Sequence, residues 1–341
     1  MKILMSSHRF YPELGGTEVH SAMLAHEFVN QGHELKLITQ TPAEQIDQEP
    51  AQFPFAVIRQ PPNNELLDLV SWCDVFFHNN ISLRVAWAIV MRPKPWVIAH
   101  HTWMRQPDGS LGWQNILKRS LTLVATNIAI SEAIAKHMPG KSTIIGNPYQ
   151  DDIFYKLPAV KRDRELIFLG RLVSDKGVDI LLQALALLKE RGTAPQLTIV
   201  GDGEELANLQ RLTQDLQLGE QVDFVGQKSR DQLAQLLNAH QIMVIPSRWE
   251  EPFGVVALEG IACGCVVVGS AGGGLKDAIG SCGLTFANGD TKALAEILYD
   301  LLLQPEQLTL YRKNAAAHLA NHRIAKVAGE YLKVLSAAIA K

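Results

Sequence analysis

Short apolar runs alternate with longer helical patterns along almost the whole chain of 341 residues. The runs lack the polar and apolar alternation of a strand with one solvated face, so we expect strands that are covered on both faces. Strands that alternate with helices form βα units and a parallel sheet. In the first half the expected strands are 2–6, 35–39, 55–58, 74–78, 96–99, 126–130 and 143–146, and a helix over 17–31 follows the first of them.

This pattern is interrupted near the middle of the chain. Residues 147–158 carry turn residues and prolines and are followed by the charged run 161–165, which is typical of a linker. A second series predicts strands 165–170, 196–200, 221–225, 241–245 and 265–268 and helices 177–191, 203–217, 229–239 and 254–263. Because the chain exceeds the usual length of one domain, we predict two α/β domains, with one or two helices in the tail 305–341.

Charge and composition exclude several classes of partner. The chain carries 32 Lys+Arg and 35 Asp+Glu, and its first 150 residues carry 12 of each kind, so neither half is basic and we expect no nucleic-acid partner. The apolar run at the N-terminus is too short for a signal peptide or a membrane span. The four cysteines match neither a zinc knuckle nor a redox CxxC pair, which indicates reduced thiols in a cytoplasmic protein.

One segment leaves a weak peripheral contact with the inner face of a membrane open. Residues 111–121 mix apolar and basic side chains at helical spacing. Such a stripe either packs into the core opposite a solvated face, which is the commoner case, or lies on a lipid surface. The first alternative predicts buried apolar side chains, and the second suits a lipid-linked ligand.

The strongest local signal for a binding site is the segment 246–260. A strand that ends at Ile245 runs into a short loop, and a helix begins near Phe253 with Pro252 at its edge, where a missing N–H costs nothing. This places the Glu251 carboxylate at the mouth of the helix, and Glu259 lies further along the same helix. Two carboxylates suit hydrogen bonds to sugar and ribose hydroxyls, while the free N–H groups of the helix N-terminus favour an anion.

Two other loops follow strands and precede helices. Arg171 and Lys176 can face a diphosphate, the first as a fork and the second as a point charge, although two solvated charges would give the same pattern. Gly15 and Gly16 would let the backbone approach a phosphate closely, although paired glycines also form plain tight turns.

Taken in this order, the motifs resemble those of family 4 of the retaining glycosyltransferases, whose α/β fold is called GT-B. The resemblance implies two Rossmann-like parallel-sheet domains that face a deep interdomain cleft: an acceptor-binding domain over 1–150 and a nucleotide-sugar-binding domain over 160–319. It also implies that a C-terminal helix, about 320–341, packs back on the first domain. The matching segments are Pro12 to Glu18, Gly170-Arg171 with Lys176-Gly177, Val200 to Gly203, Val225-Gly226, and the pair Glu251 and Glu259.

The resemblance assigns roles to these residues. The Gly15-Gly16 turn would lie over the donor phosphates, and Arg171 and Lys176 would bind the diphosphate. Glu251 would lie near the transferred sugar and Glu259 on the ribose hydroxyls. The other expected donor contacts come from Gly201, Gly226, Phe253, Gly254, Val255 and Val256.

Members of this family also carry a histidine after a strand in the middle of the first domain, near the donor sugar. Here His100 and His101 both follow the run 95–99. We favour His101 and so predict a catalytic set of Glu251, His101, Arg171 and Lys176. His100 is the alternative for this role, and capping of the loop is the structural alternative for the pair.

The implied activity is the retaining transfer of a hexose from a nucleotide diphosphate sugar, UDP before GDP, to a hydroxyl of a glycan, a lipid-linked molecule or a small molecule. No Asp-x-Asp motif is present, so we expect no metal. We also expect no cofactor, because the nucleotide sugar is a co-substrate. A dinucleotide fingerprint at Gly201 fails because Leu206 stands where a third small residue is required. A non-catalytic nucleotide-sugar-binding protein, or an epimerase or phosphorylase on the same fold, stay as alternatives.

The chain departs from the family pattern at two places. The usual Gly-Leu-Pro-Glu segment reads Gly273-Gly274-Leu275-Lys276-Asp277, with Lys in place of Pro and Asp in place of Glu, which puts the contacts of this loop with the donor sugar in doubt. Asn147-Pro148 replaces the common Asn-Gly of the linker, which bears on the geometry of the hinge.

Overall fold

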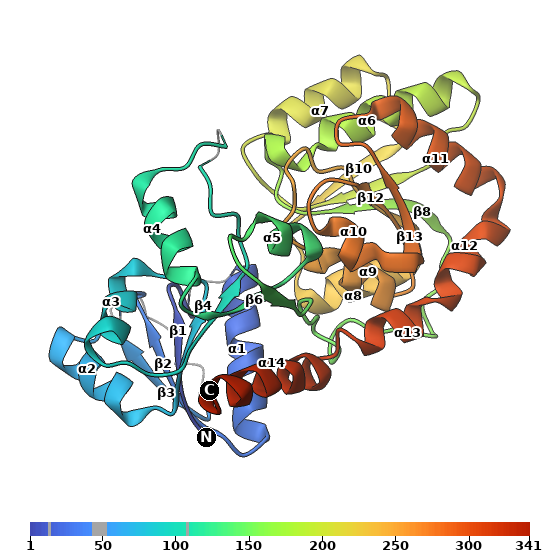
Figure 1. Ribbon diagram of the computed structural model, residues 1–341. Helices are drawn as coiled ribbons and strands as arrows, with labels where there is room; N and C mark the ends of the chain where they lie inside the picture. Colours follow the sequence, from blue (N-terminus) through green and yellow to red (C-terminus); the bar gives the residue numbers. More distant parts are fainter. Residues whose placement is uncertain (13–14, 43–52, 107–108) are drawn as a thin grey trace. The chain divides into compact units, whose positions relative to one another are not determined.

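A computed structural model describes residues 1–12, 15–42, 53–106 and 109–341 (Figure 1). The described chain divides into two compact units. Unit 1 comprises Met1–Pro148 together with Ile324–Lys341, and unit 2 comprises Tyr149–Arg323.

Unit 1 contains a sheet of seven parallel strands in the order β3-β2-β1-β4-β5-β6-β7. Helices α1 and α14 cover one face of the sheet and lie side by side (Figure 1), while α2 and α3 cover the other. Consecutive residues of a strand alternate between these two cores, since Ile3 and Met5 join the first and Leu4 joins the second. The strands are β1 (Lys2–Ser7), β2 (Glu34–Thr39), β3 (Ala56–Arg59), β4 (Val75–Asn79), β5 (Trp96–His100), β6 (Thr126–Ala129) and β7 (Ser142–Ile144), and the helices are α1 (Gly16–Asn30), α2 (Asn63–Trp72), α3 (Leu83–Met91), α4 (Trp113–Thr122), α5 (Glu132–His137) and α14 (Ile324–Ile339).

Unit 2 contains a sheet of six parallel strands in the order β10-β9-β8-β11-β12-β13. Helices α6 and α11 pack together and bury a cluster of leucines against the strands. The strands are β8 (Arg164–Leu169), β9 (Leu197–Val200), β10 (Val222–Gly226), β11 (His240–Ile245), β12 (Val266–Ser270) and β13 (Gly283–Phe286), and the helices are α6 (Val178–Glu190), α7 (Leu206–Asp215), α8 (Arg230–Ala239), α9 (Val255–Ala262), α10 (Leu275–Ile279), α11 (Thr291–Leu303), α12 (Pro305–Lys313) and α13 (Ala315–Ala320).

These two parallel sheets confirm the predicted α/β architecture of two Rossmann-like domains. The expectation of one or two helices in the tail is wrong, because the tail forms three: α12, α13 and α14. The helical structure is interrupted between α13 and α14 because the two helices belong to different units. Helix α13 contacts α9, whereas α14 packs on α1 and buries Val327, Tyr331 and Leu335 in the core of unit 1. All four cysteines are buried as free thiols.

The strand orders place a switch point in each unit. The order reverses between β1 and β4 in unit 1 and between β8 and β11 in unit 2. Loops that leave the carboxyl ends of two such strands diverge, and ligands of open α/β sheets bind in the crevice between them. Among the described residues, no helix has the length and apolar character needed to cross a membrane.

Candidate functional site

In unit 2, Lys176 and Glu251 meet at the switch point. Lys176 ends a short 3-10 turn, Ser174–Lys176, after β8, and Glu251 follows β11. The Lys176 Nζ lies 2.5 Å from Glu251 Oε1, and the two side chains are only 26% and 14% exposed. The Ser247 hydroxyl donates to the same carboxylate oxygen at 2.9 Å. Lys176 and Glu251 therefore contact each other directly, although they lie 75 positions apart in the chain. Both were predicted to bind the same ligand.

The backbone of Glu251 is held by the loop that opens α10. Glu251 pairs with Gly273, and Gly274 donates its N–H to the Glu251 carbonyl at 2.7 Å. Gly273 has φ +75°, and a Cβ at this position would lie 2.2 Å from the Glu251 carbonyl oxygen. Only glycine fits there. This loop departs from the family pattern in sequence, but its support of Glu251 was not predicted.

The N-terminus of α9 follows Glu251 directly. Gly254 caps the helix at φ +95°, and a Cβ there would lie 2.6 Å from Leu275 Cδ1. The first-turn N–H groups, which begin at Val255 and Val256, are the free donors that favour an anion. Phe253 is buried, with its ring centroid 5.6 Å from that of His322, so its side chain anchors the loop.

Glu259 occupies the second turn of α9. Burial raises the pKa of its carboxyl to about 7, and the charge of Arg230 on α8 acts in the opposite direction. A carboxyl with this pKa exchanges its proton near neutrality, so it can donate or accept a hydrogen bond to a hydroxyl. Its assignment to the ribose stays a prediction.

Arg171 is placed differently from Lys176. It is exposed directly after β8, and its side chain forms no hydrogen bond or ion pair in the described part of the chain. The loop itself is anchored, because Gly177 has φ +65° and a Cβ there would lie 2.1 Å from the Pro246 carbonyl oxygen. The backbone that carries Arg171 is therefore fixed, while its guanidinium is available to bind an anion.

Gly201 and Gly226 end the neighbouring strands β9 and β10. Gly201 has φ +139°, and a Cβ there would lie 1.9 Å from the Gly170 carbonyl oxygen, so packing of the strand-end loops alone requires glycine. Gly226 has φ +70° with no atom within 4 Å of an added Cβ. Their roles in donor binding stay predictions.

In unit 1, Gly15 and Gly16 open α1, while Glu13 and Leu14 of the same motif lie outside the described residues. Gly15 has an ordinary extended φ of -146°, and an added Cβ on Gly16 would meet nothing within 4 Å. Neither backbone conformation nor packing in the described chain therefore requires glycine at position 16. Close approach of a ligand remains as the predicted reason.

His101 is buried at the carboxyl end of β5 and is held by two consecutive asparagines. Its Nε2 lies 2.6 Å from Asn79 Oδ1, and its backbone N–H donates to Asn80 Oδ1 at 2.9 Å. Asn80 has φ +71°, a left-handed conformation that asparagine tolerates better than most residues. Neither asparagine was predicted as a site residue, although a polar pair directly after the expected strand 74–78 was a usable signal.

The hydrogen bonds around Asn79 determine which nitrogen of His101 carries the proton. The Ser21 hydroxyl donates to the Thr17 carbonyl at 2.8 Å, so it accepts from Asn79 Nδ2 at 2.6 Å. Asn79 Oδ1 therefore accepts from His101 Nε2–H, and Nδ1 is left with a lone pair. Burial lowers the pKa of His101 well below its usual value, with the neighbouring His20 acting in the same direction, so the ring is neutral.

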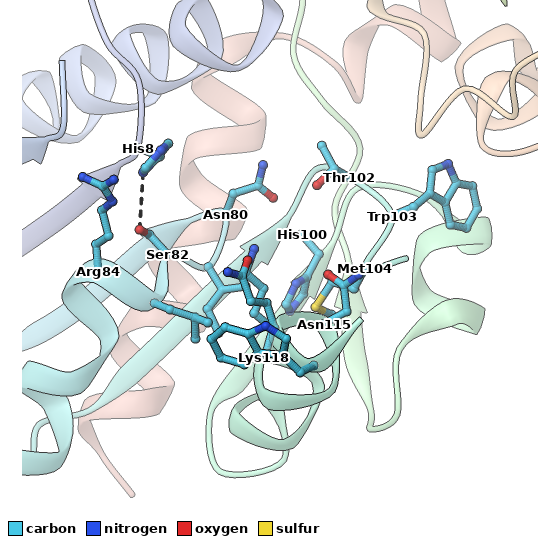
Figure 2. A pocket seen from close by; sticks show the side chains of 14 residues that line it. His8, Asn80, Ser82, Arg84, His100, Thr102, Trp103, Met104, Asn115 and Lys118 are labelled. Atoms are coloured by element: carbon cyan, nitrogen blue, oxygen red, sulfur yellow. Dashed lines mark hydrogen bonds between the residues drawn. The ribbon is translucent and has the colours of Figure 1, made fainter. Parts of the chain in front are cut away.

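His100 points elsewhere. Its Nε2 lies 2.9 Å from Asn127 Oδ1, and the residue lines a pocket of about 660 Å³ (Figure 2). The pocket is built by the loops after β1, β4 and β5 and by the first turns of α3 and α4, at the switch point of the sheet. Arg84 and Lys118 are its cationic lining residues, and the described lining holds no Asp or Glu. Its other polar lining residues are His8, Asn80, Ser82, Thr102, Gln114 and Asn115.

Two family models together match most of the chain. Residues 150–318 match "Glycosyl transferases group 1", and residues 14–142 match "Glycosyltransferase Family 4". D-inositol 3-phosphate glycosyltransferase 1 of Catenulispora acidiphila is 35% identical over 185 residues, which cover 51% of this chain and 44% of the relative. The gpi3 subunit of phosphatidylinositol N-acetylglucosaminyltransferase of Schizosaccharomyces pombe is 23% identical over 87% of this chain and 72% of the relative.

Solved structures give the same fold. HepE of Anabaena in complex with UDP has a TM-score of 0.84 at 21% identity, with 99% of this chain and 100% of that chain covered. The matched region spans about half or less of the length of the first curated relatives. Both family models and the two-domain fold agree, and the chain belongs to the group 1 glycosyltransferases of the family 4 type, with the GT-B fold.

Proposed function

We propose that the protein transfers a hexose, with retention of configuration, from a nucleotide diphosphate sugar to a hydroxyl acceptor. The observation that carries the proposal is the Lys176–Ser247–Glu251 cluster beside the N-terminus of α9. It combines a cation and free N–H groups for a diphosphate with a carboxylate for sugar chemistry. UDP is the favoured nucleotide, which agrees with the UDP complex of HepE.

Departure of the nucleotide diphosphate breaks the bond between the anomeric carbon and the phosphate oxygen. Negative charge then grows on the diphosphate while the sugar carbon becomes oxocarbenium-like. Arg171, Lys176 and the N-terminus of α9 stabilise the leaving group without a metal, and each well-placed donor contributes roughly 3–4 kcal/mol. The acceptor oxygen bonds to the anomeric carbon on the face that the diphosphate leaves, and its proton passes to the leaving phosphate. Glu251 stabilises the positive charge on the sugar.

The acceptor binds in the pocket of unit 1 described above. Its amide and hydroxyl side chains suit a polyhydroxylated molecule, and its volume of about 660 Å³ lies within the range of small-ligand sites. Asn80 both lines this pocket and fixes the backbone of His101. Asn80 thereby connects the acceptor pocket to the neutral His101. The lone pair on His101 Nδ1 can accept a hydrogen bond from a sugar hydroxyl.

Thermal shift measurements against UDP-, GDP- and ADP-sugars test the donor assignment. A ligand at 100 times its dissociation constant stabilises the native state by about 2.7 kcal/mol, so the preferred donor produces a clear shift. Arg171→Ala with Lys176→Ala is expected to abolish most of it. Arg211→Ala with Lys228→Ala, which removes two exposed cations of unit 2, should leave it unchanged.

Transfer of labelled sugar to added acceptors, with and without EDTA, tests the reaction. Activity that survives the chelator supports the metal-independent route, and activity restored only by magnesium or manganese refutes it. Donor binding without transfer or hydrolysis would identify a non-catalytic binding protein. Conversion of the donor sugar without transfer would identify an epimerase, and phosphate-dependent cleavage of a glycan would identify a phosphorylase.

A further inference from the structure

Helix α4 turns its apolar stripe to solvent. Trp113, Ile116 and Leu117 are 70%, 53% and 43% exposed, and of the ten residues of the helix only Thr122 is buried. Core packing, the commoner of the two explanations that the sequence left open for residues 111–121, therefore holds for Leu121 at the end of the segment but not for Trp113, Ile116 or Leu117. An amphipathic helix normally buries its apolar face, so a helix that exposes it is built for contact with something outside the described chain.

Further apolar side chains are exposed past the end of α4. Leu123 and Val124 are 64% and 77% exposed, and Val124 shares a hollow of about 410 Å³ with Val90 at the end of α3. Met91, next to Val90, is 61% exposed. We call this surface the α3–α4 face; it comprises Val90, Met91, Leu111, Trp113, Ile116, Leu117, Leu123 and Val124.

Along the sequence, positive charge is concentrated in the segment that contains this face, although the first 150 residues are balanced as a whole. Residues 81–145 contain eight Lys or Arg and two Asp or Glu, whereas residues 1–80 contain four and ten. The first half is neutral only because the anionic segment 1–80 balances the cationic segment 81–145. The cations of the segment are Arg84, Arg92, Lys94, Arg105, Lys118, Arg119, Lys136 and Lys141.

An exposed apolar stripe within a cationic segment is the combination that binds an anionic lipid bilayer. A second copy of this chain would bring two cationic segments together, and the repulsion between like charges opposes that contact. We propose that the α3–α4 face docks peripherally on an anionic lipid bilayer. Because the first turn of α4 also lines the pocket of unit 1, docking brings the pocket close to the lipid and, given the proposed function, selects a lipid-linked acceptor.

Vesicle flotation without donor or acceptor tests the docking separately from glycosyl transfer. The full chain should float with vesicles of equal parts phosphatidylcholine and phosphatidylglycerol, remain unbound with phosphatidylcholine alone, and dissociate in high salt. Ile116→Ser with Leu117→Ser should lower the partition coefficient at least about tenfold, because two exposed aliphatic side chains no longer enter the bilayer. The matched control is Leu303→Ser with Leu310→Ser on unit 2, where the side chains are 56% and 59% exposed, and it should bind like the wild type.

Three outcomes overturn the proposal. The first is a wild-type chain that ignores anionic vesicles. The second is undiminished vesicle binding by the Ile116→Ser, Leu117→Ser variant, or an equal loss of binding by the control variant. The third is a concentration-dependent dimer that the same double variant abolishes, which would assign the α3–α4 face to a second copy. Circular dichroism of each variant verifies that the fold persists, and none of these results depends on donor binding.

Discussion

The Lys176–Glu251 contact predicts that removal of one negative charge has opposite effects on binding and turnover. Glu251 neutralises the lysine that we assign to the donor diphosphate. Glu251→Gln keeps the length of the side chain and an acceptor for the Ser247 hydroxyl, while it removes the charge. Lys176 is then available to the diphosphate without first leaving a partner.

The size of the effect follows from the geometry. Two unit charges about 4 Å apart interact by roughly 1 kcal/mol in water and roughly 4 kcal/mol at an effective dielectric constant of about 20. The two side chains are 26% and 14% exposed, and side-chain ordering and desolvation reduce the net value of such a pair to about 1 kcal/mol. The affinity for UDP should therefore rise about fivefold in Glu251→Gln. Turnover should fall about 100-fold, the scale expected for a positioned polar group at the reacting centre.

Calorimetric titration with UDP and initial-rate kinetics measure the two effects on the same preparations. Glu250→Gln is the matched control, because it removes the same charge one residue away. Weaker UDP binding by Glu251→Gln would refute the competition between Glu251 and the diphosphate for Lys176. Undiminished turnover would refute the role of Glu251, and a loss at Glu250→Gln instead would move that role by one residue.

Three further predictions concern single positions. Gly16→Val should weaken donor binding modestly yet lower turnover about 100-fold, because a β-branched side chain keeps the backbone from the phosphates; complete loss of UDP binding in calorimetry would contradict this. Gly273→Ala should destabilise the protein by about 1–3 kcal/mol more than Gly289→Ala in thermal unfolding, since both have positive φ but only the former places its Cβ against the Glu251 carbonyl; equal losses would refute the steric argument. The pKa of the Glu259 carboxyl is raised from 4.5 to about 7, so the folded state binds this proton more tightly than the unfolded state. The resulting contribution to the free energy of unfolding is complete below pH 4.5 and is lost as the pH rises to 7, by at most ~1.4 kcal/mol per pH unit. Glu259→Gln should flatten this decline in stability, and an unchanged pH profile would show that Glu259 does not cause it.

The order and type of most elements could be predicted because the relevant signals are local. A parallel strand buried on both faces must be apolar throughout, so the runs at 2–6 and 241–245 indicate β1 and β11 without knowledge of their neighbours. The tail was predicted less well, because its helical pattern does not reveal that α13 and α14 pack on different units.

The candidate site was predictable residue by residue but not as an arrangement. The sequence pattern identifies Glu251 and Lys176 as chemically suited to a nucleotide sugar, yet neither their 2.5 Å contact nor the support by Gly273 can be read from positions that lie far apart in the chain. The same holds for His101, because its neutral tautomer depends on Asn79, which comes from the neighbouring strand.

The amino-acid sequence by itself determined the α/β class, the two series of strands and the chemistry of the loops at their carboxyl ends. Tertiary structure decided which of these loops meet, since the order of strands in a sheet is set by long-range pairing. It also decided the orientation of α4. Hydrophobic periodicity shows that a helix has an apolar face, but only the packing of the rest of the chain determines whether that face is buried or, as with Trp113 and Ile116, left to solvent.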